Sequence, residues 1–273
     1  MTKTVAVLLT VFNRKAKTLK CLESFFEQLP VEGYCFDVYL TNDGCTDGTP
    51  ETVVTQFPQV NIVEGDGTLF WNRGMYRAWE AAANVGYDLY LWLNDDVTLL
   101  EGAVETLLAE CAEKGHNAII VGSMRASQEP KLTYGGHGNN GKITPNGQLQ
   151  QCDTFNGNVI LIPHEIYAKV GNLDWRFRHA IGDLDYGCRA RRAGFEMYVS
   201  SRYLGICDSN IKRLPWVRKD VPFIKRVKNL YSPLGYAEPF PFFIYELKNF
   251  GLLIAIKHFI SIHIRLIFPA LWR

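Results

Sequence analysis

The feature that most constrains this chain is an alternation of short apolar runs and helical patterns through residues 1–120. The run at 5–11 is apolar and partly β-branched, which is typical of a strand buried on both faces of a parallel sheet. We expect strands at 5–11, 36–40, 60–63, 87–93 and 118–121, with helices at 15–28, 71–83 and 99–114. This alternation predicts an α/β sandwich with a mostly parallel sheet, in which ligands bind beyond the carboxyl ends of the strands.

The segment 123–150 interrupts the alternation. It holds five glycines and two prolines with little periodicity. It is predicted to be a long loop or hairpin, which serves either as a binding loop or lid or as a tolerated surface insertion. A strand at 158–163 and a helix at 183–194, ending at Gly194, are expected after it.

The tail from Pro239 onward is apolar and aromatic, with interspersed lysine, arginine and histidine. No uninterrupted apolar run approaches the ~20 residues that span a bilayer. The pattern fits a basic helix lying in a membrane interface, or a helix packed on the rest of the chain or on a second subunit.

Composition excludes some classes of function. The formal net charge of +1 argues against nucleic-acid binding, which needs a strongly basic domain or stripe. Seven cysteines without a C-x-x-C pair argue against a disulfide framework and a structural zinc site. The start of the chain lacks the pattern of a secretory signal. We therefore expect a reducing, cytoplasmic location.

Two groups of acidic residues follow expected strands. Asn94, Asp95 and Asp96 come directly after the apolar run 87–93. Buried carboxylates need a partner, and Mg²⁺ or Mn²⁺ prefers oxygen ligands, so this group is either a metal site or the cap of the next helix. Asp43 lies in a turn-rich stretch after the second strand, where it fits a ribose or base contact or ordinary turn chemistry.

Two further clusters could bind or react. The segment around Gly67 and Arg73 combines glycines, which let a backbone approach phosphate, with a cationic side chain near a helix start. Asp183 stands at the start of an expected helix, where it could act as a general base or as an N-cap. Asp185, two residues further on, would not share its helix face.

In their order along the chain, these pieces resemble the family 2 glycosyltransferases of the GT-A fold. The matching stretches are 10–14 (TVFNR), 42–49 (NDGCTDGT), 72–74 (NRG), 94–96 (NDD) and 182–186 (GDLDY), followed by Arg189 and Gly194. The resemblance covers about residues 4–210. It is greatest to non-processive enzymes that build bacterial cell-surface polysaccharides, including rhamnosyltransferase-like members.

The resemblance implies a fold and a set of roles. The fold would be a Rossmann-like three-layer sandwich followed by a helical tail. The catalytic domain would span 1–215, with a nucleotide-binding half at 1–120 and an acceptor-binding half at 121–215, and the helical segment would span 216–273. Asp96 would hold Mn²⁺ or Mg²⁺, and Asp183 would be the base, with Asp185 in reserve. The nucleotide site would comprise Thr10, Phe12, Asn13, Arg14, Asp43, Gly67, Asn72, Arg73, Asn94 and Asp95. The acceptor side would comprise Asn156, Gly157, Asn158 and Gly182, with Tyr134 and Trp175 as candidate sugar-stacking aromatics.

The sequence also departs from the family pattern. Asn94 replaces the first acid of the D-x-D motif, and Gly182 replaces a common glutamate. The stretch 203–208 lacks the late histidine of many members, and the Q-x-x-R-W motif of processive synthases is missing. These departures weaken the expected metal site and argue against a polymerising synthase.

The resemblance implies a metal-dependent, inverting hexosyl- or deoxyhexosyl-transferase. Its donor would be a UDP-, dTDP- or GDP-linked sugar, and its acceptor a glycan hydroxyl, on a lipid carrier at the inner-membrane surface. A homo-oligomer is compatible with the sequence. Two alternatives stay open: a nucleotidyltransferase that makes nucleotide sugars, and a non-catalytic, membrane-associated binder of nucleotide or sugar.

Overall fold

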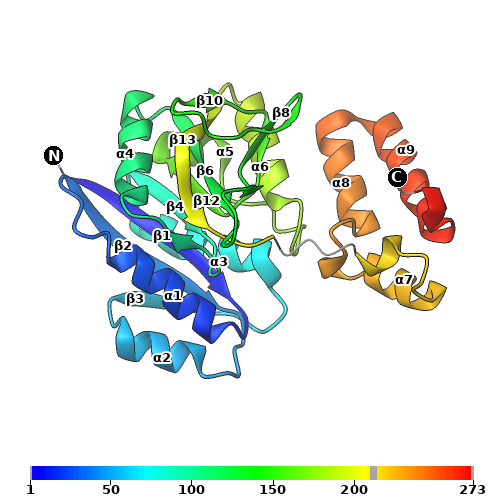
Figure 1. The fold of residues 1–273 in the computed structure, drawn as a ribbon, viewed down its shortest axis with the longest axis horizontal. Coiled ribbons are helices and arrows are strands. Elements are labelled where there is room, and N and C mark those ends of the chain that lie inside the picture. The colour runs from blue at the N-terminus through cyan, green and yellow to red at the C-terminus, as the bar shows by residue number, and fades with distance from the viewer. Residues whose placement is uncertain (1, 210–213, 272–273) are drawn as a thin grey trace.

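The computed structural model describes residues 2–209 and 214–271. Its centre is a ten-stranded mixed sheet (Figure 1). Eight of the strands follow the order β10-β13-β6-β12-β4-β1-β2-β3, and the other two, β5 and β7, pair with β13 and β6. The strands β4, β1, β2 and β3 pair in parallel. Their bounds are β1 Lys3–Val11, β2 Tyr34–Asn42, β3 Val60–Glu64 and β4 Leu89–Leu93. The predicted parallel core is therefore confirmed.

Helices cover both faces of this sheet. On one face, α1 (Lys15–Phe26), α2 (Thr49–Gln56) and α4 (Ala103–Glu113) bury their apolar sides in one core cluster. On the other, α3 (Phe70–Val85), α5 (His164–Val170) and α6 (Gly182–Arg192) contribute to a second cluster. Along β1, Val7 joins the first cluster and Leu8 the second. The strand is thus buried on both faces, as its apolar run predicts, and the three-layer sandwich is confirmed.

The second half of the sheet is less regular. β6 (Ala118–Arg125), β12 (Val159–Pro163) and β13 (Glu196–Ile206) extend the same sheet, with β5 (Thr98–Leu99) paired to β13. The segment 123–150, expected as a long loop or a hairpin, contains short strands. These are β7 (Leu132–Tyr134), β8 (Gly136–Gly138), β9 (Gly141–Lys142) and β10 (Gln150–Gln151), and β8 and β9 form a small second sheet with β11 (Thr154–Phe155). Of the two predicted forms, the structure therefore has the hairpin, whose pairing supplies backbone hydrogen bonds to the segment.

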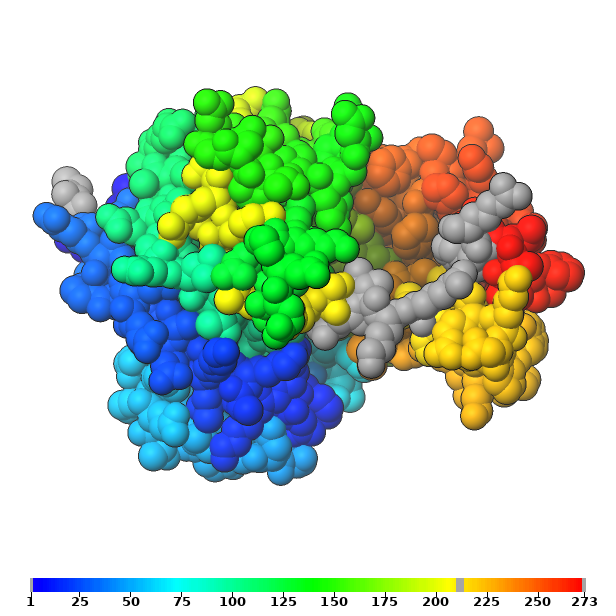
Figure 2. All heavy atoms as spheres, viewed as in Figure 1, coloured from blue at the N-terminus to red at the C-terminus, as the bar shows by residue number. Residues whose placement is uncertain are grey.

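Residues 214–271, which we call the C-terminal module, form a helical lobe beside the sandwich (Figures 1 and 2). The lobe contains α7 (Phe223–Leu230), α8 (Pro239–Phe250) and α9 (Leu252–Ile267), with 3₁₀ turns at Pro215–Val217, Pro233–Gly235 and Pro269–Leu271. Trp216, Leu230, Ile262 and Leu266 form a small core of its own. Among the described residues, no helix is both long and apolar enough to traverse a bilayer.

The module is attached to the sandwich through α6. Tyr245 of α8 packs with Phe177, Ile181 and Cys188. Beside this contact, the fully buried carboxylate of Asp185 accepts hydrogen bonds from Arg189, Lys248 and Asn249. Lys248 and Asn249 belong to α8, so this one carboxylate links both parts of the molecule.

Removing that carboxylate should be costly, because it is fully buried and the two cations that share it, Arg189 and Lys248, have only 18% and 23% of their side chains exposed. We expect Asp185→Ala to lower the free energy of unfolding by roughly 3–5 kcal/mol, as measured by urea denaturation. The control is Asp153→Ala, which removes the exposed pair with Arg191 and should cost less than about 1 kcal/mol. Equal losses in the two variants would contradict the linking role of Asp185.

Candidate active site

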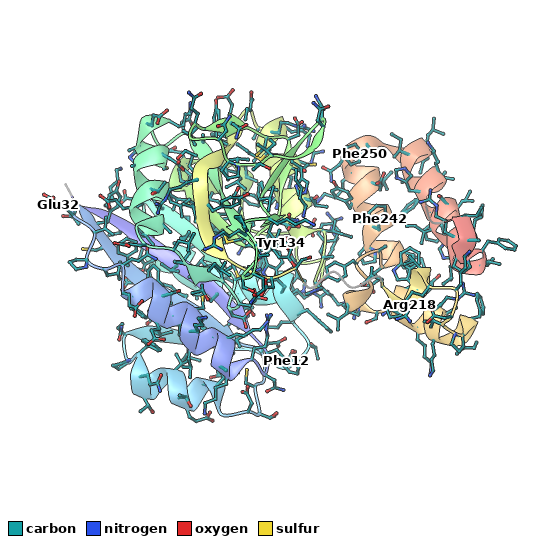
Figure 3. The ribbon with its side chains drawn as sticks, in the orientation of Figure 1. Phe12, Glu32, Tyr134, Arg218, Phe242 and Phe250 are labelled. Atoms are coloured by element: carbon teal, nitrogen blue, oxygen red, sulfur yellow. The ribbon has the colours of Figure 1, made fainter. Side chains whose placement is uncertain are left out.

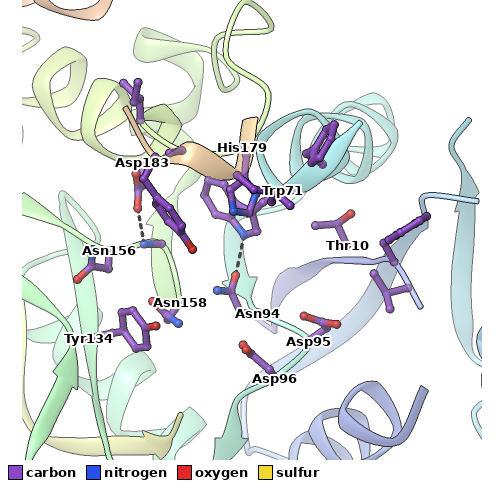
Figure 4. A pocket seen from close by; sticks show the side chains of 18 of the residues that line it. Thr10, Trp71, Asn94, Asp95, Asp96, Tyr134, Asn156, Asn158, His179 and Asp183 are labelled. Carbon is purple, nitrogen blue, oxygen red and sulfur yellow. Dashed lines mark hydrogen bonds between the residues drawn. The ribbon is translucent and has the colours of Figure 1, made fainter. Parts of the chain in front are cut away.

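One cavity of about 510 Å³ opens where the parallel strands end (Figure 4). This is within the roughly 300–1,000 Å³ usual for small-molecule sites. Its wall includes the ends of β1, β2 and β4, the start of α3, the 156–158 turn and the start of α6. Three acids that lie far apart in the sequence, Asp43, Asp96 and Asp183, all line it. The sheet therefore gathers these side chains as the strand-end rule predicts.

The two acids after β4, Asp95 and Asp96, both form ion pairs with the side chain of Arg14. The Arg14 guanidinium lies 3.1 Å from Asp95 Oδ1 and also pairs with Asp96 Oδ2. Both carboxylates are almost fully buried, whereas the Arg14 side chain is 36% exposed toward the cavity. The cation thus partly compensates two buried negative charges that would otherwise be unstable together.

Burial changes the titration of this group. It raises the pKa of Asp95 to about 7, and the neighbouring Asp96 adds to the shift while Arg14 opposes it. The Cys207 thiol donates to Asp96 Oδ1 at 3.6 Å, and burial together with that carboxylate raises the pKa of the thiol. Cys207 lies in the stretch that lacks the family's late histidine, so a thiol reaches the acid pair there.

Asp43 is bound by backbone rather than by a side chain. Its carboxylate accepts hydrogen bonds from the backbone N–H groups of Gly67, Leu69 and Phe70 at 2.9, 3.2 and 3.0 Å. Gly65 is in close contact with Asp43, since an added Cβ would lie 2.9 Å from Asp43 Oδ1. Asp43 therefore fixes the segment that leads into α3 and shapes this side of the cavity.

Asp183 lies on the opposite wall at the first turn of α6. Asp183 Oδ2 accepts from Gly157 N at 3.0 Å and Oδ1 from Leu184 N at 2.9 Å. Burial raises the pKa of Asp183, although the bond from Gly157 opposes the shift. Two residues before Asp183, Ile181 has a φ of 81°, a strained conformation for a β-branched residue that is typical of functional sites. The result is a positioned carboxylate with an increased proton affinity.

An aromatic wall joins the two acidic sides. Trp71 Nε1 donates to Asn94 Oδ1 at 2.7 Å (Figure 4), and the Trp71 ring lies against Gly157 so closely that an added Cβ would approach it to 2.7 Å. His179 packs edge-on against Phe70 and Tyr236. Burial, together with Arg14, lowers the pKa of His179 to about 4. The imidazole is therefore neutral near pH 7.

Most of the predicted residues line the cavity. They are Thr10, Phe12, Arg14, Asp43, Asn94, Asp95, Asp96, Asn156, Gly157, Asn158 and Asp183, together with the aromatic candidate Tyr134. Figure 3 shows Phe12, which is 51% exposed, and Tyr134 on the sandwich, away from the far helices of the module. The structure thus brings together residues from both expected halves.

The remaining predicted residues lie outside the cavity wall. Asn72 is fully buried and donates to the carbonyls of Asp174 and Phe177, so its observed contacts are structural and its nucleotide contact stays a prediction. Asp185 is fully buried at the junction with α8, away from the cavity wall, which makes Asp183 the better placed of the two candidate bases. The other five residues outside the wall also have structural contacts. Asn13 accepts a hydrogen bond from Thr46 N, and Gly67 N donates one to Asp43. The Arg73 guanidinium lies over the ring of Trp175, which accounts for two more, and Gly182 packs against Asn72.

Several cavity residues were not predicted from the sequence. Trp71 and His179 were adjacent to recognised motifs, so proximity to NRG and GDLD was the available signal. Three more come from the C-terminal module: Leu234, Tyr236 and Phe242. Their spacing carries no site motif, and only the docking of the module brings them to the cavity. Tyr236 has a φ of 59°, which is unusual for a bulky residue.

The carboxylate oxygens of the acid pair are suitable ligands for a divalent cation. Within residues 2–209 and 214–271, no cluster of three or more His, Cys, Asp or Glu side chains is arranged to hold a metal. Two adjacent carboxylates are nevertheless sufficient for Mg²⁺, which usually binds one or two protein carboxylates together with substrate phosphates. Asp96 and Asp95 would hold it, and Arg14 would have to release at least one of them.

The comparisons with known proteins agree with this architecture. The model of the glycosyl transferase family 2 matches residues 6–166, which is more than half of the chain. Solved glycosyltransferase structures share the fold at low identity. TarS from S. aureus in complex with UDP-GlcNAc has a TM-score of 0.57 at 13% identity, over 95% of this chain and 81% of that chain. The mannosyltransferase PcManGT from Pyrobaculum calidifontis, in complex with GDP-Man and Mn²⁺, has 0.55 at 13%, over 94% and 74%. The fold is therefore GT-A.

The chain thus belongs to glycosyl transferase family 2. A curated relative is the N-acetylglucosaminyl-diphospho-decaprenol L-rhamnosyltransferase of Mycobacterium tuberculosis. It is 26% identical over 197 residues, which are 60% of this chain and 64% of the relative. More than a third of the relative's own length is therefore not covered by this chain.

The raised pKa of Asp95 predicts how stability depends on pH. A carboxyl that binds its proton more tightly when folded stabilises the protein below its unfolded pKa of about 3.9, and this contribution is lost as the pH rises through about 7. We expect the urea midpoint of the metal-free protein to fall between about pH 4 and 7, and Asp95→Asn to flatten that fall. Asp153→Asn, on the exposed surface, is the control. An unchanged slope in Asp95→Asn would contradict this assignment.

Proposed function

We propose that this protein transfers a sugar from a nucleotide donor to a hydroxyl of a glycan acceptor, with inversion at the anomeric carbon. The observation that carries the proposal is the convergence of Asp43, Asp96 and Asp183 on one cavity at the strand ends of a family 2 chain. Two acids on one side and a separate acid opposite fit a leaving diphosphate on one side and a proton acceptor on the other.

We assign the nucleotide to the side formed by the ends of β1 and β2. The exposed ring of Phe12 offers a stacking surface for a base, and Thr10 lies beside it in the cavity wall. The donor's diphosphate would then lie toward Arg14 and the acid pair. Asp96, with Asp95, would hold Mn²⁺ or Mg²⁺, which would neutralise the negative charge of the leaving diphosphate. The manganese-containing relative with this fold supports that assignment.

Asp183 is the proposed general base. Its carboxylate accepts the proton of the acceptor hydroxyl as that oxygen forms a bond to the anomeric carbon. The bond between that carbon and the diphosphate oxygen breaks at the same time, and its electron pair leaves with the nucleoside diphosphate. Attack from the face opposite the leaving group inverts the configuration. The hydrogen bonds from Gly157 N and Leu184 N keep the carboxylate in place for this step.

The acceptor would approach from the side of the C-terminal module. Leu234, Tyr236 and Phe242 bring apolar and aromatic surface to the cavity there, facing the 156–158 turn and Tyr134. Aromatic faces suit sugar rings, and aliphatic side chains suit a lipid. The relative's name specifies a decaprenol-linked diphospho-sugar, and by that likeness we propose a lipid-linked glycan as the acceptor in the synthesis of a cell-surface polysaccharide.

We place this reaction in a reducing compartment, the cytoplasm. All seven cysteines are free, and five of them are buried, so the fold does not depend on oxidation. The catalytic domain we propose ends near residue 215, and the C-terminal module completes the acceptor side.

A release assay tests the metal and donor assignments. UDP-, GDP- and dTDP-sugars would be incubated with the protein in Mn²⁺ or in chelator, and free nucleoside diphosphate measured. We expect release from one donor class only, with a loss on the order of 10²-fold in Asp96→Ala because an electrostatic contact to the leaving group is removed. Asp208→Ala, an exposed acid beside Cys207 that binds Ser127, is the matched control. Undiminished release in chelator and in Asp96→Ala would assign charge neutralisation to Arg14 instead.

The pH profile tests the base. Because the pKa of Asp183 is raised, the deprotonated form is lost at higher pH than for an ordinary aspartate, so kcat/KM should fall on acidification with an apparent pKa above about 4. Asp183→Asn should lower transfer by roughly 10²–10⁴-fold while nucleotide affinity, measured by calorimetry, stays unchanged. Normal transfer by Asp183→Asn would rule out Asp183 as the base. If neither the wild type nor the variant transfers sugar while both bind nucleotide, the protein is a non-catalytic binder.

A further inference from the structure

The C-terminal module leaves large apolar side chains uncovered. On α9, Leu253, Ile256, Ile260, Ile264 and Ile267 are all exposed, and Leu253 reaches 83%. They are separated by three or four positions, so they form one stripe along the helix. Fully exposed apolar side chains are ordinary when single, but a continuous stripe marks a surface that binds something.

This stripe is distinct from the face that α9 buries. Ala255, Ile262 and Leu266 point into the module. At about 100° per residue, the centre of the exposed stripe lies well over a quarter-turn away from that buried face. Lys257 is exposed at the edge of the stripe. The helix α9 therefore has one apolar side that packs inside the module. A second apolar side, with Lys257 at its edge, is exposed to solvent.

The preceding helix continues the surface. Phe240, Leu247 and Phe250 of α8 are exposed, and Phe243 lies on the same helical face between them (Figure 3 labels Phe250). The rings of Phe240 and Phe243 both contact the ring of Phe259 on α9, with centroids 6.0 and 5.7 Å apart. The two stripes thus meet at the seam of the helical hairpin and make one surface, which we call the α8–α9 face.

The module that carries this face is mostly positively charged, and Lys257 of α9 is exposed beside the stripe. Residues 214–271 contain eight lysines and arginines against three acids. Two of the acids are committed inside the structure, Glu238 to Arg178 and Glu246 to His258. Within this described range, Asp220 is the one exposed acid, and it pairs with Arg218. The exposed lysines are Lys219, Lys225, Lys228 and Lys257.

We propose that the α8–α9 face docks onto an anionic lipid surface. Its apolar stripes would enter the interface between headgroups and acyl chains, and the lysines would meet lipid phosphates, as amphipathic basic helices do. A second copy of this chain is the weaker candidate. A two-fold contact would place the same face against itself and bring together two copies of Lys257 and two positively charged modules. An anionic bilayer satisfies both the apolar surface and the charge.

Docking would also orient the cavity. Leu234 and Tyr236 belong to the same module and line the cavity, so a module held on lipid would keep the proposed acceptor side near the bilayer. This consequence rests on the proposed function. The docking itself does not, because vesicle binding requires neither donor nor acceptor.

Vesicle flotation of the full chain tests the proposal. We expect the protein to float with phosphatidylcholine vesicles that contain phosphatidylglycerol, and much less with phosphatidylcholine alone or in high salt. The triple substitution Leu253→Gln, Ile260→Gln, Ile264→Gln should weaken binding roughly tenfold or more, because it removes buried apolar area at the interface. The matched control replaces two equally exposed valines of the sandwich, Val54→Gln and Val85→Gln, and should float like the wild type.

Three results would overturn the proposal. The first is a wild type that stays unbound on anionic vesicles, and the second is an α9 triple variant that floats as well as the control. The third is a wild type that sediments as a dimer while the triple variant sediments as a monomer, which would make the face a self-association surface. Unchanged thermal midpoints in both variants exclude misfolding as the cause. Release of nucleoside diphosphate in solution is measured on the same samples. Release without vesicle binding would refute docking alone, and vesicle binding without release would refute the proposed reaction alone.

Discussion

The Arg14 guanidinium between two buried carboxylates is the interaction on which the site depends. Asp95 and Asp96 follow β4, whose five residues are all buried, and neither acid could remain ionised there without a cation close by. Arg14 comes from the turn between β1 and α1, so the pair also fixes the ends of β1 and β4 against each other. One positive charge against two acids leaves an excess of negative charge at the cavity wall. A divalent cation bound together with a diphosphate would suit that imbalance, and Arg14 would then be free to turn toward phosphate.

The core of this architecture could be predicted because its signals are local. The apolar run at β1 requires burial on both faces, and the strand–helix alternation then requires parallel pairing, which gathers the strand ends at one edge. The positions of Asp43 and Asp96 follow from that rule alone. Asp183 lies on another segment, and its role as the base in the same cleft was predicted through the family resemblance rather than from periodicity.

The rest depended on tertiary contacts that no local pattern encodes. Asn72 belongs to a recognised motif, yet burial turns it into a structural link to the 174–177 turn. Asp185 resembled a spare base, but α8 supplies two partners that hold it in the junction. Tyr236 could not be assigned from sequence, because the docking of a distant helical module places it beside His179. The short strands within 123–150 pair mostly through hairpins. Their individual positions could not be predicted, because the glycines of the segment leave no alternation of apolar and polar residues.

The two parts of the chain therefore differ in what they contribute. The sandwich gathers the acids, and the helical module lines one side of the cavity and presents an apolar face outward. The most direct test is a crystal structure with Mn²⁺ and the nucleoside diphosphate of the active donor. We predict one anomalous manganese peak on Asp96, with Arg14 displaced from at least one carboxylate, the base near Phe12, and Asp183 across the cavity from the diphosphate. Density for the nucleotide on any other surface, with the acid pair still held by Arg14, would contradict the account.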